Sequence, residues 1–174
     1  MNIVLFGITG LGNAVLEQLI EMNKKPKLVI TRHELKMIDP YLKLKNLGEF
    51  SKKNNIKVEY DKSFCSYYFD LCIVATYHKK INIKLSNFKK ALNIHPSYLP
   101  KYRGRDPIRD VLANNENYSG VSAHILTEEF DKGKIILQEQ IYIKNLKKKF
   151  QIMKKMYPIY KNFTRQIINN FHKL

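Results

Sequence analysis

The chain has 174 residues, of which 44% are hydrophobic and 11% aromatic, and this predicts one domain, residues 1–174, with a buried core. It contains no run of about 18 apolar residues and begins directly with a strand-like segment, so we predict no membrane span or signal peptide and expect a cytoplasmic location. Its two cysteines, Cys65 and Cys72, are too few for a disulfide framework or a metal knuckle.

The net charge of +16 raises nucleic acid, a membrane surface and an anionic substrate as partners. The basic residues are mostly lysines, and they are scattered rather than gathered in one stripe with aromatic residues. A coding bias alone would also produce such lysines. We therefore expect an anionic small molecule as the partner, rather than nucleic acid or a membrane.

The first half of the chain alternates between strand and helix patterns. The elements that we predict are a strand at 2–6, a glycine turn at 7–13, a helix at 14–22, a strand at 28–31, a loop with one helical turn at 31–45, a helix at 47–54 and a buried strand at 71–75. This alternation is typical of an α/β fold, in which a parallel sheet carries helices on its faces.

The second half continues the pattern and then changes it. The predicted elements are a strand at 92–95, a helix at 108–114, strands at 121–126 and 135–143, and a C-terminal amphipathic helix over 150–171 that is interrupted or restarted at Pro158. The two late strands alternate with period two, and we expect them to pair in antiparallel fashion through the loop 127–134.

The first candidate site is the glycine turn, Gly7-x-x-Gly10-x-Gly12. Gly10 and Gly12 would let backbone amides approach a phosphate near a helix N-terminus. A close strand–helix turn without any ligand explains the glycines equally well. The spacing is not that of dinucleotide-binding folds and no well-placed acid follows the strand 28–31, so NAD is not predicted.

The second candidate site lies where the strand 92–95 ends. Asn93 and His95 are two residues apart, so their side chains share one face of the strand at the edge where α/β sheets place their ligands. The proline-rich loop that follows would present Ser97, Arg103 and Arg105. Asn is a neutral donor suited to a developing oxyanion, and His relays protons near neutral pH.

The loop 127–134 supplies a possible third component. It carries three acids, and Asp131, which precedes Lys132 and Gly133, is the one that we expect to face inward and orient His95. Taken alone, the segment is also a plain polar hairpin loop. His124 has a weaker signal, because a histidine on an alternating strand is more often a satisfied structural residue, and His78 lies in a loop that would line a cleft.

Three segments together resemble the folate-dependent formyltransferase family, which includes methionyl-tRNA formyltransferase, glycinamide ribonucleotide transformylase and the sugar N-formyltransferases. The segments are NIVLFGITGLGNAVLEQLI, NIHPSYLPKYRGRDPI and GVSAHILTEEFDKGKIILQEQI, and they follow in order from residue 1 to about residue 143. The resemblance implies a single Rossmann-like core with a C-terminal helix that binds 10-formyltetrahydrofolate and moves its formyl group to an amine. It implies no metal.

The resemblance also assigns roles to residues. Asn93, His95 and Asp131 fall on the catalytic triad, in which Asn93 and His95 stabilise the tetrahedral oxyanion while Asp131 holds His95 and assists proton transfer. The pterin is expected against two segments, which comprise Ala75, Thr76, Tyr77 and His78, and Thr127, Glu128 and Phe130. The acceptor is expected near Gly10, Gly12, Ser97, Arg103 and Arg105.

The Arg-Gly-Arg-Asp-Pro turn at 103–107 looks more like the sugar and tRNA branches than the ribonucleotide branch. The chain ends after its C-terminal helix, which disfavours tRNA, so a nucleotide-linked amino sugar or another phosphorylated amine is the expected acceptor. Sugar enzymes usually continue into a region that supports dimerisation, so a homodimer stays open. The alternatives are glycinamide ribonucleotide as acceptor, or a module that binds folate or nucleic acid without turnover.

Overall fold

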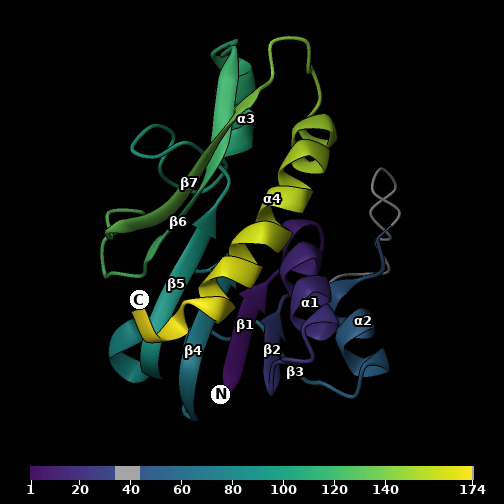
Figure 1. Ribbon diagram of the computed structural model, residues 1–174, viewed down its shortest axis with the longest axis vertical. Helices are drawn as coiled ribbons and strands as arrows, with labels where there is room; N and C mark the ends of the chain where they lie inside the picture. The colour runs from purple at the N-terminus through teal and green to yellow at the C-terminus, as the bar shows by residue number, and fades with distance from the viewer. Residues whose placement is uncertain (34–43, 174) are drawn as a thin grey trace.

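The computed structural model describes residues 1–33 and 44–173, so most of the loop predicted at 31–45 lies outside the described residues. A seven-stranded sheet in the order β3-β2-β1-β4-β5-β6-β7 forms the centre (Figure 1). Its strands are β1 Ile3–Gly7, β2 Leu28–Thr31, β3 Lys57–Tyr60, β4 Tyr68–Ala75, β5 Asn87–His95, β6 Tyr118–Ile125 and β7 Ile135–Tyr142. The helices are α1 Leu11–Glu21, α2 Leu47–Lys53, α3 Pro107–Ala113 and α4 Lys149–Asn169, with short 3-10 helices at Ile83–Leu85 and Phe171–Lys173.

The first five strands are parallel, and the last two are not. β1 pairs with both β2 and β4 in parallel, whereas β6 runs antiparallel to β5 and β7 antiparallel to β6. Every residue of β1 and β2 is buried, as expected for strands that are covered on both faces. The predicted fold class and the antiparallel pairing of the two late strands are therefore confirmed.

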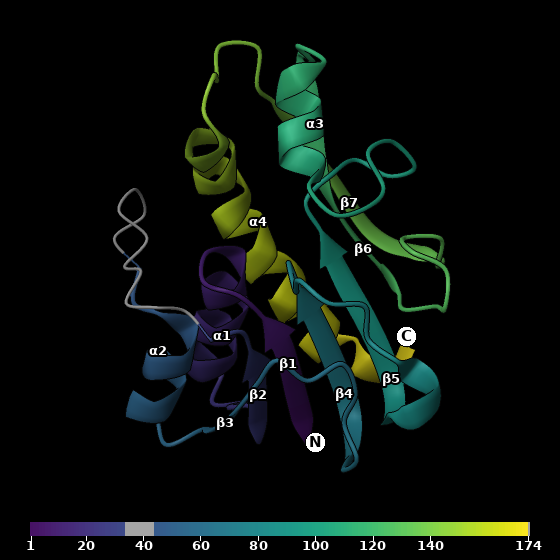
Figure 2. The ribbon, with the colours of Figure 1, turned by 180° about the vertical axis from the view of Figure 1, so that it is seen from behind.

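Helices α1 and α4 lie side by side across one face of the sheet (Figure 1). They bury their apolar residues against the odd-numbered side chains of β1 and the middle of β4 and β5. The sheet seen from behind (Figure 2) is covered on its opposite face by connecting segments, among which Cys65 and Ile81 pack on Val4 and Phe6. Both cysteines are buried free thiols.

One strand is missing from the predicted elements, and two predicted helices need correction. β3 was not predicted, because its sequence KVEY is only partly buried at the edge of the sheet and lacks an apolar run. α1 begins at Leu11, earlier than the predicted 14, since Gly10 serves as its N-cap. α4 continues through Pro158 without interruption: the proline is exposed, and the buried residues Met156 and Ile159 on either side hold the helix against the core.

Candidate active site

A cleft of about 1120 Å³ opens at the carboxyl ends of the parallel strands. Its walls come from the turn after β1, the ends of β4 and β5, the start of α3, the loop between β6 and β7, and Lys149 and Met153 of α4. The chain crosses from one side of β1 to the other when it enters β4, so the cleft lies at the point where strand order reverses.

Asn93 and His95 enter the cleft from the end of β5. Their side chains share one face of the strand, while Ile94 between them is buried in the core and its carbonyl accepts a hydrogen bond of 2.8 Å from Tyr160. The side chain of His95 is only 5% exposed. The predicted placement of these two residues on one strand face therefore agrees with the geometry.

Asp131 reaches the same point from the loop between β6 and β7. Its backbone adopts φ of 53°, and its Oδ2 accepts a hydrogen bond of 2.8 Å from the Gly104 N–H. The Arg103 Nε donates to the Asp131 carbonyl at 3.1 Å, which ties the two loops together. The carboxylate is therefore held on a constrained loop, as the position before Lys132 and Gly133 suggests.

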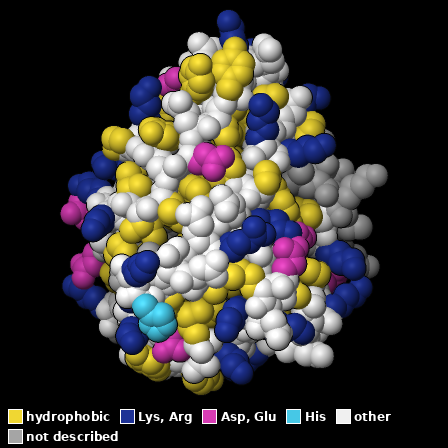
Figure 3. All heavy atoms as spheres, in the orientation of Figure 1, with side chains coloured by type: hydrophobic (Ala, Val, Ile, Leu, Met, Phe, Trp, Pro, Cys, Tyr) yellow, Lys and Arg dark blue, Asp and Glu magenta, His cyan; other side chains and the backbone are white. Residues whose placement is uncertain are grey.

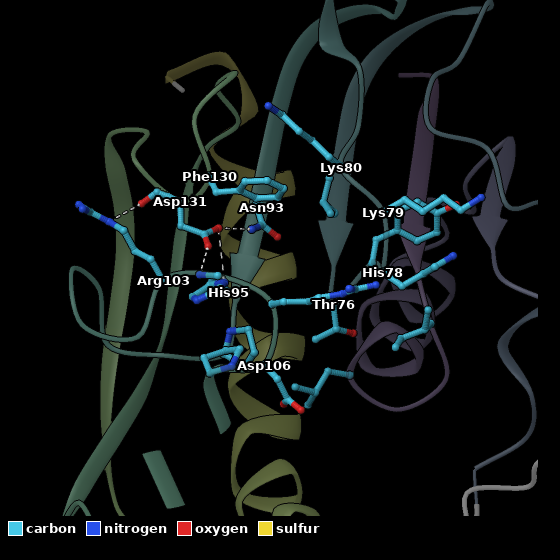
Figure 4. Close-up of a pocket in the computed structure, with 18 of the residues that line it drawn as sticks. Thr76, His78, Lys79, Lys80, Asn93, His95, Arg103, Asp106, Phe130 and Asp131 are labelled. Atoms are coloured by element: carbon cyan, nitrogen blue, oxygen red, sulfur yellow. Dashed lines mark hydrogen bonds and ion pairs between the residues drawn. The ribbon is translucent and has the colours of Figure 1, made fainter. Parts of the chain in front are cut away.

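Three side chains converge on one oxygen of that carboxylate, and two of them, Asn93 and His95, are drawn in Figure 4. Asp131 Oδ1 lies 3.1 Å from Asn93 Nδ2, 3.3 Å from His124 Nε2 and 3.5 Å from His95 Nδ1. The second interaction of Asn93 Nδ2 is with His124 Nε2, at 3.2 Å. Both hydrogens of the Asn93 amide thus face protein atoms. To donate to a substrate oxyanion, Asn93 would have to give up one of these two contacts.

The surroundings lower the pKa of both His95 and Asp131, but for different reasons. Burial lowers the pKa of His95 below the ordinary histidine value, and the attraction of Asp131 only partly opposes this. Burial acts to raise the pKa of Asp131, but its contacts with His124, His95 and the Gly104 N–H outweigh burial and lower it. Asp131 is therefore a carboxylate at neutral pH.

We expect the free energy of unfolding to fall as the pH is lowered through the ordinary histidine value of 6.5. The unfolded chain takes up a proton in that range while folded His95, whose pKa is depressed, still resists it, so stability is lost towards the folded pKa. Urea unfolding of the wild type and the His95→Asn variant from pH 8 to pH 5 measures this.

His95→Asn should show the shallower fall, although His78, whose pKa is also lowered by burial, keeps part of the slope in both proteins. The exposed His172→Asn variant is the control. Parallel curves for wild type and His95→Asn would show that His95 does not contribute to this pH dependence.

Most residues predicted to hold the pterin line the cleft. Thr76, Tyr77 and His78 lie after β4, and Thr127, Glu128 and Phe130 lie opposite in the loop after β6. Ala75 is not among the lining residues, because it is the buried end of β4.

Two contacts join the segment after β4 to the loop after β6. The Lys80 ammonium lies 5.3 Å from the centre of the Phe130 ring, and Lys84 pairs with Glu128 at 3.3 Å. Lys80 and Lys84 carry no sequence signal that distinguishes them from the other lysines.

The glycine turn is closed rather than open to a ligand. The Gly10 N–H donates to Asn13 Oδ1 at 2.9 Å, and a Cβ on Gly12 would lie 3.2 Å from a Leu47 methyl group. Neither glycine lines the cleft. The close strand–helix turn without a ligand thus accounts for both glycines, and their assignment to the acceptor stays a prediction without support from this geometry.

The proline-rich loop divides its predicted residues between structure and cleft. Ser97 is fully buried, lies outside the cleft lining and donates to the Lys101 carbonyl at 2.8 Å. Arg103 and Arg105 line the cleft. Arg103 also donates a hydrogen bond to the carbonyl of Asp131. Ser97 therefore shapes the loop rather than facing the cleft.

Several residues of this site either had a weak signal in the sequence or were not predicted from it. His124 lies at its centre, because β5 and β6 pair in the register that sets Asn93 opposite His124, and a single sequence does not reveal that register. Lys79, Asp106, Arg109 and Lys149 also line the cleft. Their clue is position, since residues 106–109 directly follow the loop that carries Arg103 and Arg105.

Over residues 1–33 and 44–173, no group of three or more His, Cys, Asp or Glu side chains is placed to hold a metal ion. Within the same part of the chain, no helix combines the length and the apolar character needed to cross a membrane.

A family model described as formyl transferase matches residues 8–164. The methionyl-tRNA formyltransferase of Thermotoga maritima is 43% identical over 76 residues, which cover 42% of this chain and 24% of that protein. The methionyl-tRNA formyltransferase of Mycoplasmopsis pulmonis is 28% identical over 145 residues, 78% of this chain and 50% of that protein. The chain thus spans half or less of the length of these relatives.

Solved structures share the fold over nearly the whole chain. The sugar 3N-formyltransferase WlaRD, crystallised with dTDP and 5-N-formyl-THF, superimposes with a TM-score of 0.79 at 27% identity, covering 98% of this chain and 64% of that one. The phosphoribosylglycinamide formyltransferase of Streptococcus pneumoniae gives a TM-score of 0.73 at 18% identity and covers 99% of both chains. The second likeness shows the fold alone.

Proposed function

Because the chain belongs to the formyl transferase family, we propose that it moves a formyl group from 10-formyltetrahydrofolate to the amine of a nucleotide-linked amino sugar. The observation that carries the proposal is the convergence of Asn93, His95 and Asp131 at one end of β5. These are the three residues that the family resemblance assigns to catalysis. Asn93 and His95 line the same wall of the cleft, which lies where the strand order of the sheet reverses.

The cleft offers a suitable place for a folate. Its wall after β4 and its wall after β6 present apolar groups from Val74, Ile81, Leu126 and Phe130, and the exposed Phe130 ring is 59% accessible. A flat pterin suits such a slot between two backbone segments. The bound donor would supply the activated formyl group, and the protein residues would supply orientation and proton placement.

In this arrangement, Asp131 holds a negative charge beside His95. A proton on His95 Nδ1 would be stabilised by that carboxylate at 3.5 Å and would let His95 stabilise an oxygen that gains negative charge. The neutral imidazole can in turn accept a proton from an attacking amine. These are the two tasks that formyl transfer to an amine requires of the protein.

The end of the cleft at α3 suits an acceptor that carries phosphates. Lys149 is neutralised by Asp106 at 2.7 Å, but neither Arg105 nor Arg109, which are both exposed and line the cleft, has such a partner among residues 1–33 and 44–173. Two uncompensated guanidinium groups favour a phosphate or diphosphate ligand. The 27% identity to a sugar 3N-formyltransferase supports a nucleotide-linked sugar.

Methionyl-tRNA is a second candidate acceptor, because the curated relatives named above are methionyl-tRNA formyltransferases and the chain carries a net charge of +16. On the face seen in Figure 3, the Lys and Arg side chains are spread over many elements rather than gathered into one patch. An RNA-binding surface is expected to concentrate them, so this face favours the smaller acceptor.

An acceptor panel tests the choice. The protein is supplied with 10-formyltetrahydrofolate and, separately, nucleotide-linked 3-amino and 4-amino sugars, glycinamide ribonucleotide and methionyl-tRNA, while tetrahydrofolate release is followed. Turnover with a nucleotide-linked amino sugar and not with the same sugar lacking its nucleotide supports the proposal. Preferred turnover with methionyl-tRNA or glycinamide ribonucleotide would replace the acceptor but keep the reaction.

Replacement of Arg105 or Arg109 by alanine should raise the KM for the phosphate-bearing acceptor by about tenfold or more, since a charged hydrogen bond is worth roughly 1.5–3 kcal/mol. The KM for 10-formyltetrahydrofolate and kcat should change by less than about threefold. Lys144→Ala, which removes an exposed positive charge outside the cleft lining, is the matched control. Equal effects of all three variants would indicate a general charge effect rather than a phosphate site.

A further inference from the structure

His124 is the one member of the buried polar cluster around Asp131 to which the proposed reaction gives no task. Its side chain is 1% exposed, it is absent from the cleft lining, and yet it touches both Asn93 and Asp131. A buried imidazole at such a position needs a hydrogen-bonding reason, and its contacts supply one.

Backbone carbonyls determine where each histidine carries its hydrogen. A carbonyl oxygen only accepts, so the nitrogen that faces it must donate. His124 Nδ1 lies 2.8 Å from the carbonyl of Ile125, and His95 Nε2 lies 2.9 Å from the carbonyl of Tyr102. In the neutral state His124 is therefore the Nδ1–H tautomer and His95 the Nε2–H tautomer, and the remaining nitrogen of each ring is a bare acceptor.

Both bare nitrogens lie near Asp131 Oδ1, which is itself an acceptor, at 3.5 Å for His95 Nδ1 and 3.3 Å for His124 Nε2. The Asn93 amide supplies two hydrogens, and its nitrogen lies 3.1 Å from Asp131 Oδ1 and 3.2 Å from His124 Nε2. These hydrogens satisfy the carboxylate and His124. No hydrogen is left for the gap between His95 Nδ1 and Asp131 Oδ1.

We propose that His124 is a positioning residue: its bare Nε2 accepts a hydrogen bond from the Asn93 amide and holds the amide nitrogen towards Asp131. The inference rests on the proposed function for its catalytic meaning, although the proton placement itself does not. Figure 4 shows the amide nitrogen of Asn93 on the side of Asp131 and its oxygen turned away.

The opposite tautomer of His124 would disrupt this arrangement of the cluster. A hydrogen on Nε2 would meet the hydrogen of Asn93 across 3.2 Å and force the amide to rotate. The other groups that face the cluster are Arg103, bonded to the Asp131 carbonyl, and Tyr160 of α4, bonded to the carbonyl of Ile94. The Arg103 Nε–H and the Tyr160 hydroxyl are thus both committed to backbone carbonyls.

Nitrogen-15 NMR of the uniformly labelled full chain tests the proton placement directly. Long-range proton–nitrogen spectra from pH 8 to pH 5 distinguish the two neutral tautomers from the imidazolium, and the spectra of His95→Asn and His124→Gln assign the signals. At pH 8 we expect the neutral Nδ1–H tautomer at His124 and the neutral Nε2–H tautomer at His95. An Nε2–H tautomer at His124 overturns the inference.

Two substitutions then separate positioning from packing. In His124→Gln the new carbonyl oxygen can still accept from Asn93, so kcat should stay within about threefold of the wild type. In His124→Leu that acceptor is lost, and kcat should fall about tenfold, which corresponds to one hydrogen bond, with KM for 10-formyltetrahydrofolate nearly unchanged. Equal loss in both folded variants, or none in His124→Leu, contradicts the positioning role.

The outcomes also separate this inference from the proposed function. Absence of formyl transfer to any amine, together with the expected NMR tautomers, would remove the reaction but leave the placement of Asn93 by His124 intact. Formyl transfer with the reverse proton placement would do the opposite. If His124→Leu does not fold, the NMR result and His124→Gln decide the question.

Discussion

Replacement of His95 by alanine is expected to lower kcat for formyl transfer by about 10³-fold or more, the upper part of the range for a lost general acid–base group. Nδ1 of His95 lies 3.5 Å from Asp131, and no other cleft-lining histidine contacts that carboxylate among the described residues. The reaction thereby loses both its proton carrier and the cation that Asp131 would stabilise. Steady-state tetrahydrofolate release with the preferred amine measures the effect.

The fold should survive the substitution. His95→Ala leaves the core on the opposite side of β5 unchanged, where Ile94 and Tyr160 remain bonded, so a melting temperature within several degrees of the wild type and unaltered folate affinity are expected. His172→Ala, an exposed histidine, should keep full activity. Turnover by His95→Ala near the wild-type rate would remove this residue from the mechanism.

Gly133→Ala should destabilise the protein by at least about 3 kcal/mol or prevent folding, because the change forces atoms together in a packed backbone region. A Cβ at this position would lie 1.7 Å from the Ile125 carbonyl oxygen and 2.8 Å from its carbon. Backbone atoms of β6 cannot move aside as a side chain would. The loop that carries Asp131 would therefore shift, and activity should fall together with stability.

Urea unfolding and formyl transfer measured on the same samples check this prediction. Gly48→Ala is the matched control, since its Cβ meets only side-chain atoms, at 3.0 Å and beyond, and alanine favours the helix by roughly 1 kcal/mol. It should stay within about 1 kcal/mol of the wild type. A Gly133→Ala protein of normal stability would show that this loop adapts, and that its close packing does not fix Asp131.

The sequence patterns predicted the central strands but not the edge of the sheet. The fully apolar run LCIVA identifies β4 because buried parallel strands are hydrophobic on both faces. The KVEY segment of β3 lies at the edge, is half-buried and has no such signature. The extension of β5 back to Asn87 was missed for the same reason, since its first residues alternate between exposed and half-buried positions.

The site was predictable to the extent that it depends on neighbours in the sequence. The spacing of Asn93 and His95 alone predicts a common face at a strand end, and the geometry agrees. The place of Asp131 before Lys132 and Gly133 predicted that it faces inward, whereas its membership of a catalytic triad came only from the resemblance to a family. The close packing of Gly133 against Ile125, which helps to place this loop, is not visible in the sequence. His124 could not be placed, since its contact with Asn93 follows from the register between β5 and β6.

The glycine turn is a motif for which the sequence left two interpretations open, a phosphate site and a turn without a ligand. The same glycines that would cradle a phosphate also permit a turn closed by an asparagine cap and a leucine contact. The hydrogen bond of 2.9 Å from the Gly10 N–H to Asn13 Oδ1 supports the closed turn. Capping side chains three residues into a helix are therefore worth checking before a phosphate site is inferred.

The measurement that tests the central claim most directly compares the wild type with Asp131→Asn, both supplied with 10-formyltetrahydrofolate and the acceptor panel. Tetrahydrofolate release is followed together with the mass of each amine. We predict that the wild type releases tetrahydrofolate in step with the gain of one formyl group on the amine, and that Asp131→Asn binds folate but loses at least about 10²-fold in rate. Folate binding by the wild type without formylation of any amine, or equal transfer by both proteins, would contradict the account.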